Sequence, residues 1–455
     1  MYLPVLGRTM KGRDGLQGNP ETRGQYVLIV LDGLGDLPHP SLQGNTPLGA
    51  ATTPHLDALA QRSELGLLDP VRKGVAPESD AGVLGLLGYD PEQESPGRGV
   101  LEAMGISLDL RPGDVALRFN FATTDASGKI VDQRVGRNLA TEEAAALAEA
   151  LTQARLLESE GIEATVSATV GHRGVLRLTS LTPEELSPDV TNSDPFYERA
   201  GRAGHAVKPK EPRVKEVLPQ NSTPSAVRTS RALNLFSARV ANLLPEQEVN
   251  HFRKARGALV ANNLIVRDAG TLPQGLPSFA ARHGLHGAAV TEMPVERGIA
   301  LLLGLADVFV GPMGKDVPGA LRHRAEMVRR ELDQEHRPFV YVHLKGPDEP
   351  GHDGDALRKK QIVEDLDQHF MGPFLDGLDL SRVTVAVTAD HSTPCVLRGH
   401  SDDPVPLLVS TRGKVQDPSK NVRYTEDFAR KGTLGEHLGK ELLPYLLRGE
   451  WPTSG

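Results

Sequence analysis

The clearest sign of chemistry in this sequence is an apolar run followed closely by a carboxylate and an imidazole. Phe339–Leu344 is rich in β-branched and aromatic residues, a composition typical of a buried strand. Asp348 and His352 follow it, four residues apart, and a carboxylate and an imidazole at such a turn can converge on one metal ion. The alternative is an acidic loop that caps the helix expected from about Ala356.

Three further apolar runs have potential metal ligands beside them. These are Tyr26–Leu31 followed by Asp32, Val383–Thr388 followed by Asp390 and His391, and Val405–Ser410 preceded by His400. In open α/β sheets, functional sites form beyond the carboxyl ends of the parallel strands. Together with Asp348 and His352, these side chains supply six oxygen or nitrogen ligands. That is about the number that two divalent ions need alongside a nucleophile and water.

Ser79 is the candidate nucleophile. It lies between a Gly/Pro-rich segment, Asp69–Pro77, and a run of small and apolar residues, Ala81–Leu87, that predicts a helix. Backbone N–H groups and the helix dipole at such an N-terminus favour negative charge, including a phosphate or a serine alkoxide. The alternative is that Ser79 only caps the helix, which is the commoner use of serine at this position.

Composition narrows the class of protein. A net charge of −8 among 455 residues, without a long basic run, argues against a general nucleic-acid binder. No apolar run approaches the length that spans a membrane, and the polar, Gly-rich extension at residues 1–24 has no signal-peptide region. The single cysteine, Cys395, excludes an intrachain disulfide. We therefore expect no nucleic-acid or membrane partner and a reducing, cytoplasmic location.

The order of the predicted elements separates the chain into a discontinuous α/β part and an insert. Strand-like and helical runs alternate on both sides of the insert, as in a mostly parallel sheet flanked by helices. The insert combines a helix over Thr141–Glu158, short alternating strands and a helix over Pro224–Leu243, which predicts a small α+β unit. The predicted boundaries are 1–24 for the N-terminal extension, 25–125 and 275–455 for the α/β part, and 126–274 for the insert.

Several arginines are placed where they could hold a phosphorylated substrate. Arg134, Arg137 and Arg173 lie in the insert, and Arg173 directly follows His172. Guanidinium groups bind phosphate and carboxylate through paired hydrogen bonds. The alternative for each of them is the ordinary one, a solvated surface arginine.

A set of short motifs occurs in order across most of residues 26–410. The motifs are Asp32-Gly-Leu-Gly-Asp, Asn45-Thr-Pro-Leu, Thr53-Pro-His-Leu-Asp, Glu78-Ser-Asp, Leu87-Gly-Tyr-Asp-Pro, Gly97-Arg-Gly, Asn120-Phe-Ala-Thr, Lys345-Gly-Pro-Asp-Glu with His352-Asp-Gly, and Thr388-Ala-Asp-His-Ser-Thr-Pro. In this order and combination, the chain resembles the cofactor-independent phosphoglycerate mutases, with the archaeal-type branch as the closer match, within the alkaline phosphatase superfamily. The insert matches that family less clearly.

The resemblance implies an α/β, alkaline-phosphatase-like, mostly parallel sheet flanked by helices, with the insert as a small α+β cap, and a centre of two divalent metal ions. It assigns one ion to Asp32, Ser79, Asp390 and His391, and the other to Asp348, His352 and His400. Ser79 would also be the nucleophile. Carboxylates and imidazoles without cysteine suit Mn²⁺, Mg²⁺, Co²⁺ or Zn²⁺, and the family does not require 2,3-bisphosphoglycerate.

The implied activity interconverts 3-phosphoglycerate and 2-phosphoglycerate through a phosphoserine, while the cap retains the glycerate and excludes water. His172 is the predicted general acid/base, because the unperturbed pKa of histidine lies close to neutrality. The predicted substrate-binding residues are Arg98, Arg118, Asp132, Arg134, Arg137, Arg173 and Lys345, with Asp194 as a further candidate.

Some residues depart from the family pattern and bear on the choice of substrate. Glu78 precedes Ser79 where a small residue is expected, and Ala81-Gly82-Val83 stands where a histidine is expected. Val266-Arg-Asp-Ala-Gly is more charged than the corresponding family segment. The alternatives are a phosphohydrolase or a kinase-like phosphotransferase that uses the same serine and metals, and a non-catalytic metal-binding protein of the same fold.

Overall fold

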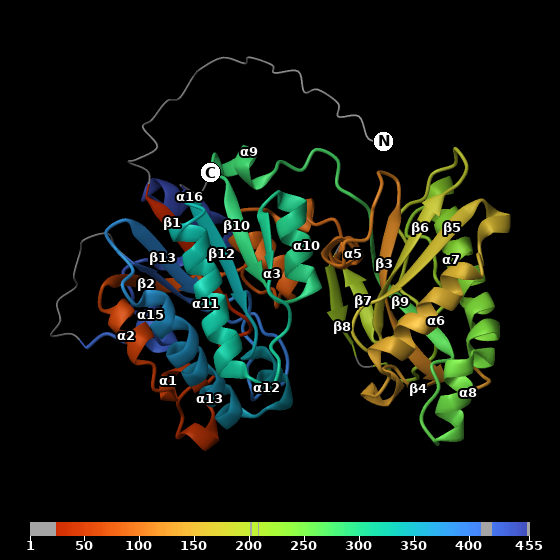
Figure 1. The fold of residues 1–455 in the computed structure, drawn as a ribbon, viewed down its shortest axis with the longest axis horizontal. Helices are drawn as coiled ribbons and strands as arrows, with labels where there is room; N and C mark the ends of the chain where they lie inside the picture. The colour runs from red at the N-terminus through yellow and green to blue at the C-terminus, as the bar shows by residue number, and fades with distance from the viewer. Residues whose placement is uncertain (1–23, 201–202, 208, 411–420, 453–455) are drawn as a thin grey trace, which may run out of the picture.

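The computed structural model describes residues 24–200, 203–207, 209–410 and 421–452. Two units lie side by side in Figure 1, and each is built around its own main sheet. We call the larger one the sheet domain and the smaller one the cap. Apart from Gly24, the predicted N-terminal extension falls outside the described residues.

The sheet domain contains an eight-stranded sheet in the order β11-β10-β12-β1-β13-β14-β2-β15. Its strands are β1 (Gln25–Leu31), β2 (Ser63–Asp69), β10 (Gly287–Thr291), β11 (Ala306–Phe309), β12 (Phe339–Leu344), β13 (Val383–Thr388), β14 (Val405–Ser410) and β15 (Gly435–Leu438). The five strands from β11 to β13 are parallel, whereas β14 is antiparallel to both β13 and β2. The start of β14 therefore lies at the same edge as the carboxyl ends of β1 and β13.

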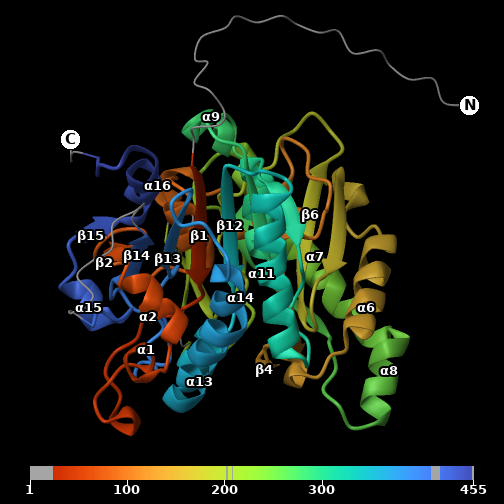
Figure 2. The same ribbon diagram turned by 60° about the vertical axis from the view of Figure 1, so that its left-hand side comes forward.

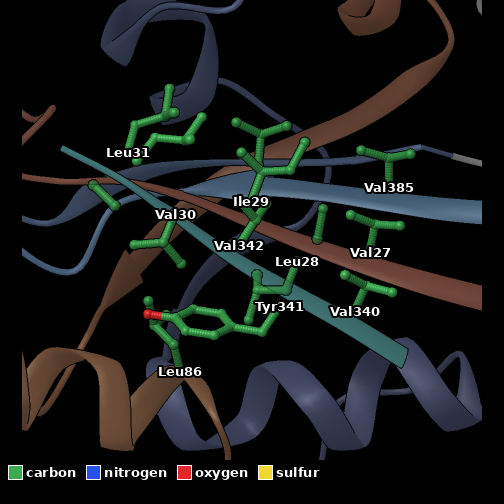
Figure 3. Packing of buried hydrophobic residues seen from close by; sticks show 14 of the residues in the cluster. Val27, Leu28, Ile29, Val30, Leu31, Leu86, Val340, Tyr341, Val342 and Val385 are labelled. Atoms are coloured by element: carbon green, nitrogen blue, oxygen red, sulfur yellow. The ribbon is translucent and has the colours of Figure 1, made fainter. Parts of the chain in front are cut away.

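The central strands form the core because their sequences are apolar on both faces. Every residue of β12 and the last five of β1 are buried, as expected for parallel strands covered on both sides. Figure 3 shows Ile29 and Val342 among the packed side chains, with Tyr341 beside Leu86 below the sheet. Burying each such aliphatic side chain stabilises the fold by roughly 1.5–3 kcal/mol. The packed strands therefore hold their ends, and the loops that follow them, in place.

Helices form two layers around this sheet (Figures 1 and 2). One layer groups α1 (Pro47–Ala50), α2 (Pro54–Ala60), α11 (Val317–Asp333), α13 (Ala356–Leu366) and α14 (Gly372–Leu375), and the other groups α3 (Ser79–Leu86), α5 (Arg98–Gly105), α10 (Pro294–Leu303) and α16 (Gly439–Arg448). Shorter helices are α4 (Pro91–Glu94), α9 (Phe279–His283), α12 (Asp348–Asp353) and α15 (Glu426–Arg430). The prediction of a mostly parallel sheet flanked by helices is confirmed.

The cap is an antiparallel sheet in the order β4-β3-β6-β5, with β9 paired to β3. Its elements are β3 (Val115–Thr124), β4 (Ile130–Asp132), β5 (Ile162–Ala168), β6 (Arg173–Ser180), β9 (Asn263–Gly270), α6 (Thr141–Gln153), α7 (Pro224–Leu243) and α8 (Glu248–Ala255), with a separate ribbon of β7 (Tyr197–Ala200) and β8 (Ala203–Ala206). Apolar side chains such as Phe119, Leu147 and Phe236 form a second core between the sheet and these helices.

Helix α5 joins the two units. It packs against α10 of the sheet domain on one side and against β3, β6 and β9 of the cap on the other. Strand pairing places β3, which begins at Val115, and β9, which ends at Gly270, in the cap sheet. The division at 126–274 stays a prediction, and this pairing favours a cap that begins ahead of β3.

The strands that carry the predicted ligands match their predicted ranges closely, but some elements differ. The segment after β12, expected to be a loop, forms the short helix α12, whose first turn carries Asp348 and Glu349 and which ends at Gly354 in the left-handed conformation (φ +76°). Strands β2, β9 and β15 were not predicted, and β9 in particular is interrupted by charge in its sequence, NLIVRDAG.

Within the described residues, no helix is long and apolar enough to cross a membrane.

Candidate active site

The predicted nucleophile and three predicted ligands meet at the carboxyl edge of the large sheet. Ser79 Oγ lies 3.2 Å from His391 Nε2. The same ring nitrogen lies 3.5 Å from Asp32 Oδ1 and 3.4 Å from Asp390 Oδ2. All four side chains are buried, so segments distant in sequence form one compact cluster.

Two glycines allow these segments to come close together. A Cβ atom on Gly82 would lie 2.1 Å from the Asp390 carbonyl oxygen, so only glycine lets α3 pack this closely against the segment that carries Asp390 and His391. Gly33 has a φ of +63°, and its N–H donates to Asp390 Oδ1 over 3.1 Å. The residue after Asp32 therefore needs the left-handed conformation that glycine adopts at low cost.

Asp348, His352 and His400 form a second cluster at the same edge. His352 Nε2 and His400 Nε2 each lie 3.5 Å from Asp348 Oδ1. His400 Nδ1 faces the Pro77 carbonyl oxygen at 2.8 Å, and His352 Nδ1 faces a backbone carbonyl at 3.4 Å. Histidines whose second nitrogen is fixed in this way present Nε2 as a metal ligand.

Thr393 connects the two clusters, and the sequence prediction did not assign it a role. Its hydroxyl donates to Asp348 Oδ1 over 2.7 Å and lies 3.0 Å from His391 Nδ1. The rings of His391 and His400 stack with centroids 3.8 Å apart. The only sequence signal for Thr393 was its position within the Thr388-Ala-Asp-His-Ser-Thr-Pro motif.

The residues at this edge fit divalent metal ions. Within the described part of the chain, Asp32 Oδ1 and Asp390 Oδ2 are buried without a hydrogen-bond donor, an arrangement that is costly unless a cation completes it. Burial lowers the pKa of His391, but Asp390, Asp32 and Asp348 outweigh it and raise the pKa to about 9. The position therefore strongly favours positive charge, and its oxygen and nitrogen donors suit several divalent ions.

Lys345, a predicted substrate-binding residue, lies against the first cluster. Its Nζ is 3.1 Å from Asp32 Oδ2 and 2.7 Å from Glu296 Oε1. Burial lowers the pKa of Lys345, but the two carboxylates outweigh it and raise the pKa well above its usual value. Lys345 is therefore a fixed positive charge beside Asp32, and a quarter of its side chain stays exposed.

One face of the cap sheet carries polar and charged side chains. Cross-strand pairs place Arg118 opposite Arg267 and Asn120 opposite Arg173, and directly paired residues point to the same face of a sheet. Arg267 Nη2 also donates to Asn120 Oδ1 over 3.5 Å. Because α5 packs across these strands, this face is turned toward the sheet domain.

Side chains of alternating charge form a chain of ion pairs that begins at Glu78, the residue before Ser79, and crosses this face. The members of this charge chain, in order, are Glu78, Arg98, Glu102, Arg118, Asp268, Arg267 and Asp194, and consecutive members approach to 3.0, 3.5, 2.8, 3.3, 3.6 and 2.8 Å. Burial raises the pKa of Glu78, but Arg98, His400 and His391 outweigh it and lower the pKa. Glu78 therefore lies between the arginines on one side and His391 and His400 on the other.

The charge chain was only partly anticipated. Arg98 and Arg118 were predicted, and Asp194 was a further candidate, whereas Glu102, Arg267 and Asp268 received no role. The signal available for Arg267 and Asp268 was the unexpected charge in Val266-Arg-Asp-Ala-Gly. Asp268 has a φ of +57° beside an irregularity in the β3–β9 register, and such bulges redirect side chains.

The arginines among the remaining predicted residues, Arg134, Arg137 and Arg173, lie near His172. Asp132, Arg134 and Arg137 line a cavity of about 340 Å³ together with Phe196. Burial and the charges of Arg173, Arg134, Arg267 and Arg137 lower the pKa of His172 to about 4. Among the described residues, the guanidinium groups of Arg134, Arg137 and Arg173 have no ion-pair partner, unlike those of the charge chain.

The backbone around Arg137 is strained. Val135, Gly136 and Arg137 have φ values of 52°, 67° and 55°, and a β-branched residue such as Val135 rarely adopts positive φ. Strain of this kind is held by surrounding structure and is common at ligand-binding sites. This backbone conformation forms one tight turn, with Arg134 at its start and Arg137 at its end.

The fold and the clustered serine, aspartates and histidines define an α/β protein with a candidate nucleophile among potential metal ligands at the carboxyl edge of a mostly parallel sheet. A family model described as 2,3-bisphosphoglycerate-independent phosphoglycerate mutase matches residues 60–250. A protein of that name from Aeropyrum pernix is 43% identical over 422 residues, covering 91% of this chain and 96% of the relative. Another from Methanopyrus kandleri is 40% identical over 429 residues, covering 93% and 95%. This chain belongs to the 2,3-bisphosphoglycerate-independent phosphoglycerate mutase family.

Solved structures agree with this assignment. A protein from Pyrococcus horikoshii matches with a TM-score of 0.74 and 28% identity, covering 95% of this chain and 99% of the other. The cofactor-independent phosphoglycerate mutase from Thermoplasma acidophilum matches with a TM-score of 0.62 and 30% identity, covering 93% and 99%. The likeness therefore extends over both the sheet domain and the cap.

Proposed function

We propose that this protein interconverts 3-phosphoglycerate and 2-phosphoglycerate through a phosphoserine formed at Ser79. The observation that carries the proposal is the position of Ser79 Oγ, 3.2 Å from His391 Nε2 and within the cluster that Asp32 and Asp390 complete. A serine at a helix N-terminus beside such ligands has the environment that stabilises an alkoxide and an incoming phosphoryl group. Family membership supplies the substrate.

Two divalent ions are part of the proposal. Asp32, Ser79, Asp390 and His391 would hold one ion, and Asp348, His352 and His400 would hold the other. Bound Mn²⁺, Mg²⁺, Co²⁺ or Zn²⁺ would lower the pKa of the serine hydroxyl and neutralise charge on the phosphoryl oxygens. Since Ser79 itself carries the phosphoryl group between the two hydroxyls, 2,3-bisphosphoglycerate is not needed.

The chain's own residues hold the glycerate while Ser79 is phosphorylated. Arg134, Arg137 and Arg173 have guanidinium groups available for the substrate carboxylate or phosphate. His172, with a pKa of about 4, is neutral near pH 7, so its ring can accept the proton of the substrate hydroxyl that attacks the phosphoserine. Arg98, paired with Glu78 beside the nucleophile, and Lys345, beside Asp32, are fixed positive charges next to Ser79 and the carboxylates.

The cap would exclude water, so that the phosphoserine returns its phosphoryl group to glycerate rather than to water. We propose that residues 126–274 are inserted between the α/β segments 25–125 and 275–455, and that β3, at the end of the first segment, belongs to the cap. We also propose a cytoplasmic location, because the single cysteine, Cys395, is free and buried.

The test is a coupled assay of metal-reconstituted protein with 3-phosphoglycerate and no 2,3-bisphosphoglycerate. We expect 2-phosphoglycerate without free phosphate, lost on addition of EDTA. Ser79→Ala should lower kcat on the order of 10⁴-fold or more, whereas Ser159→Ala on the cap surface should leave it unchanged. Release of phosphate from monoesters would indicate the phosphohydrolase instead, and a requirement for a nucleotide would indicate the kinase. Activity that survives Ser79→Ala would overturn the proposal.

A further inference from the structure

Arg253 is a buried arginine of the cap to which the proposed function gives no task. It belongs to α8, which packs against α6 at one end of the cap (Figures 1 and 2). Its side chain is fully buried, and each of its guanidinium nitrogens has an acceptor. A guanidinium always carries its charge and can only donate, so the acceptors around a buried one show what it holds together.

Two of these acceptors belong to Asn138, the residue that follows the strained turn at Val135–Arg137. Nη2 of Arg253 donates to Asn138 Oδ1 over 2.5 Å, and Nη1 donates to the Asn138 carbonyl oxygen over 3.3 Å. Arg253 therefore holds both the side chain and the backbone of one residue. Such paired bonding depends on the planar arrangement of donors that arginine alone provides.

The remaining contacts fix Arg253 within the cap. Nε donates to the Leu259 carbonyl oxygen over 2.7 Å, and Nη1 lies 2.5 Å from Glu143 Oε2. Glu143 lies in the first turn of α6, and its Oε2 also accepts from the Ala140 N–H over 3.0 Å. Arg253 thus joins α8 and the start of α6 to the turn that ends before Asn138.

The turn needs an anchor of this kind because its own backbone bonds are few. The Arg137 N–H donates to the Arg134 carbonyl oxygen over 2.9 Å, but the Asn138 N–H reaches the Val135 carbonyl oxygen only over 3.5 Å. Positive φ at Val135 and Arg137 is held only when surrounding structure supports it. The two bonds from Arg253 supply that support at the end of the turn.

The anchored segment also lies against the turn that carries His172. A Cβ atom on Gly171 would lie 3.5 Å from the carbonyl oxygen of Leu139, the residue after Asn138. Arg134 and Arg137 are close enough for their charges to lower the pKa of His172. The place of Asn138 therefore sets where both arginines lie relative to that histidine.

We propose that Arg253 is a positioning residue for substrate binding, which holds Asn138 and thereby the turn that presents Arg134 and Arg137 to the phosphorylated substrate. This inference rests on the proposed role of those two arginines and adds the residue that places them. Arg253 acts through the turn and not on the substrate, because its own side chain is fully buried.

The competing account is that Arg253 only stabilises the cap. Under that account, Arg253→Met lowers Tm, but the folded variant binds substrate like the wild type. Any remaining loss of activity would also be the same whether or not Arg134 and Arg137 are present, because effects at independent sites add. The two accounts therefore differ in KM and in the coupling between these positions.

The first test is steady-state kinetics of full-length, metal-loaded protein with 3-phosphoglycerate, well below the Tm of each variant. Arg253→Met should lower kcat/KM by about 10–100-fold, mainly through KM, since small misplacements of binding groups have effects of this size. In protein that already carries Arg134→Ala and Arg137→Ala, adding Arg253→Met should lower kcat/KM by less than about threefold.

Arg256→Met is the matched control. Arg256 directly follows α8 and pairs with the same carboxylate, with Nη2 2.7 Å from Glu143 Oε1, whereas the bonds to Asn138 come from Arg253. This variant removes a guanidinium from the same cluster and leaves the turn anchored. It should keep the kcat and KM of the wild type.

The second test follows the turn without substrate. Amide hydrogen exchange in residues 134–138, measured by mass spectrometry, should be about tenfold faster or more in Arg253→Met, because a charged hydrogen bond that holds the turn is lost. Exchange in the strands of the sheet domain should match the wild type. Arg256→Met should match it in both regions.

Wild-type KM and wild-type exchange at 134–138 in folded Arg253→Met would overturn the inference, and so would an equal loss of kcat/KM with and without Arg134 and Arg137. If Arg253→Met does not fold, Asn138→Ala decides, because it removes one acceptor at an exposed residue. It should raise KM and speed exchange at 134–138, and wild-type values of both would overturn the inference.

Failure of the proposed function gives a different result. Wild-type protein that does not convert 3-phosphoglycerate, or unchanged kinetics in both Arg134→Ala and Arg137→Ala, would remove the substrate role of the turn and of Arg253 with it. In contrast, an active wild type whose kinetics depend on Arg134 and Arg137 but not on Arg253 would overturn this inference alone.

Discussion

The two charged regions of this molecule are built in opposite ways. At the carboxyl edge of the large sheet, buried carboxylates such as Asp32 and Asp390 outnumber the cations near them, and some of their oxygens find no donor among the described residues. On the facing cap, the arginines of the charge chain alternate with carboxylates at 2.8–3.6 Å. The first arrangement is incomplete until cations bind, whereas the second is complete within the protein.

This difference separates two groups of arginines. Arg98, Arg118 and Arg267 are neutralised by protein carboxylates, so their first role is to hold α5, β3 and β9 together across the boundary between the units. Within the part of the chain that the structure describes, no protein carboxylate pairs with Arg134, Arg137 or Arg173. The comparison therefore predicts that stability depends on the first group and substrate binding on the second.

Metal removal should have the largest effect on activity, because it acts on the incomplete region. We expect EDTA to abolish mutase activity and Mn²⁺ or Co²⁺ to restore it, with a rise in Tm on adding the ion. An ion at 100 times its Kd stabilises the folded state by about 2.7 kcal/mol. Calorimetry with and without the ion measures this. An unchanged Tm and full activity in EDTA would show that the carboxylate cluster needs no cation.

Arg118→Met should strongly destabilise the protein. The guanidinium lies between Glu102 and Asp268, and all three side chains are buried. Removing one partner leaves buried charge uncompensated, at a cost of about 3–5 kcal/mol. Urea unfolding monitored by circular dichroism measures the loss. Arg155→Ala, which removes an exposed ion pair with Glu158, is the control and should change the unfolding free energy by less than about 1 kcal/mol.

Arg134→Ala, Arg137→Ala and Arg173→Ala should show the reverse pattern. Each should lower kcat/KM by the equivalent of about 1.5–3 kcal/mol of charged hydrogen bonding, while urea midpoints stay close to the wild type. Steady-state kinetics with 3-phosphoglycerate measure the effect. Unchanged kinetics in all three variants would remove these arginines from the substrate site and end the division into two groups.

The pH dependence of stability gives the smallest expected effect. The folded-state pKa of His172, about 4, lies below the usual value near 6.5. Between those values the unfolded state binds a proton that the folded state does not, so the free energy of unfolding falls as pH falls through this window. His172→Asn should flatten that part of the curve. A profile that His172→Asn leaves unchanged would contradict the lowered pKa.

The sequence placed the carboxylates and imidazoles at the carboxyl edge of the large sheet because its signals there are local. Each ligand follows or precedes an apolar run whose range the structure reproduces, as for Asp390 and His391 after β13. Parallel strands then bring these ends together without further information.

The cap was harder to predict because its chemistry depends on register. The pairing of Arg118 with Arg267 and of Asn120 with Arg173 joins residues far apart in the sequence, and a shift of one residue would turn them to the other face. Glu102 contributes only because α5 packs between the two units. No local pattern in the sequence specifies these contacts.

The central claim is that Ser79 carries the phosphoryl group between the two hydroxyls. The most direct measurement is mass spectrometry of metal-loaded protein mixed with 3-phosphoglycerate, quenched in acid within the first turnovers and digested. We predict a phosphoryl group on the peptide that contains Ser79, absent without metal and absent in Ser79→Ala. Turnover to 2-phosphoglycerate with no phosphorylation at Ser79 at any quench time would contradict the account.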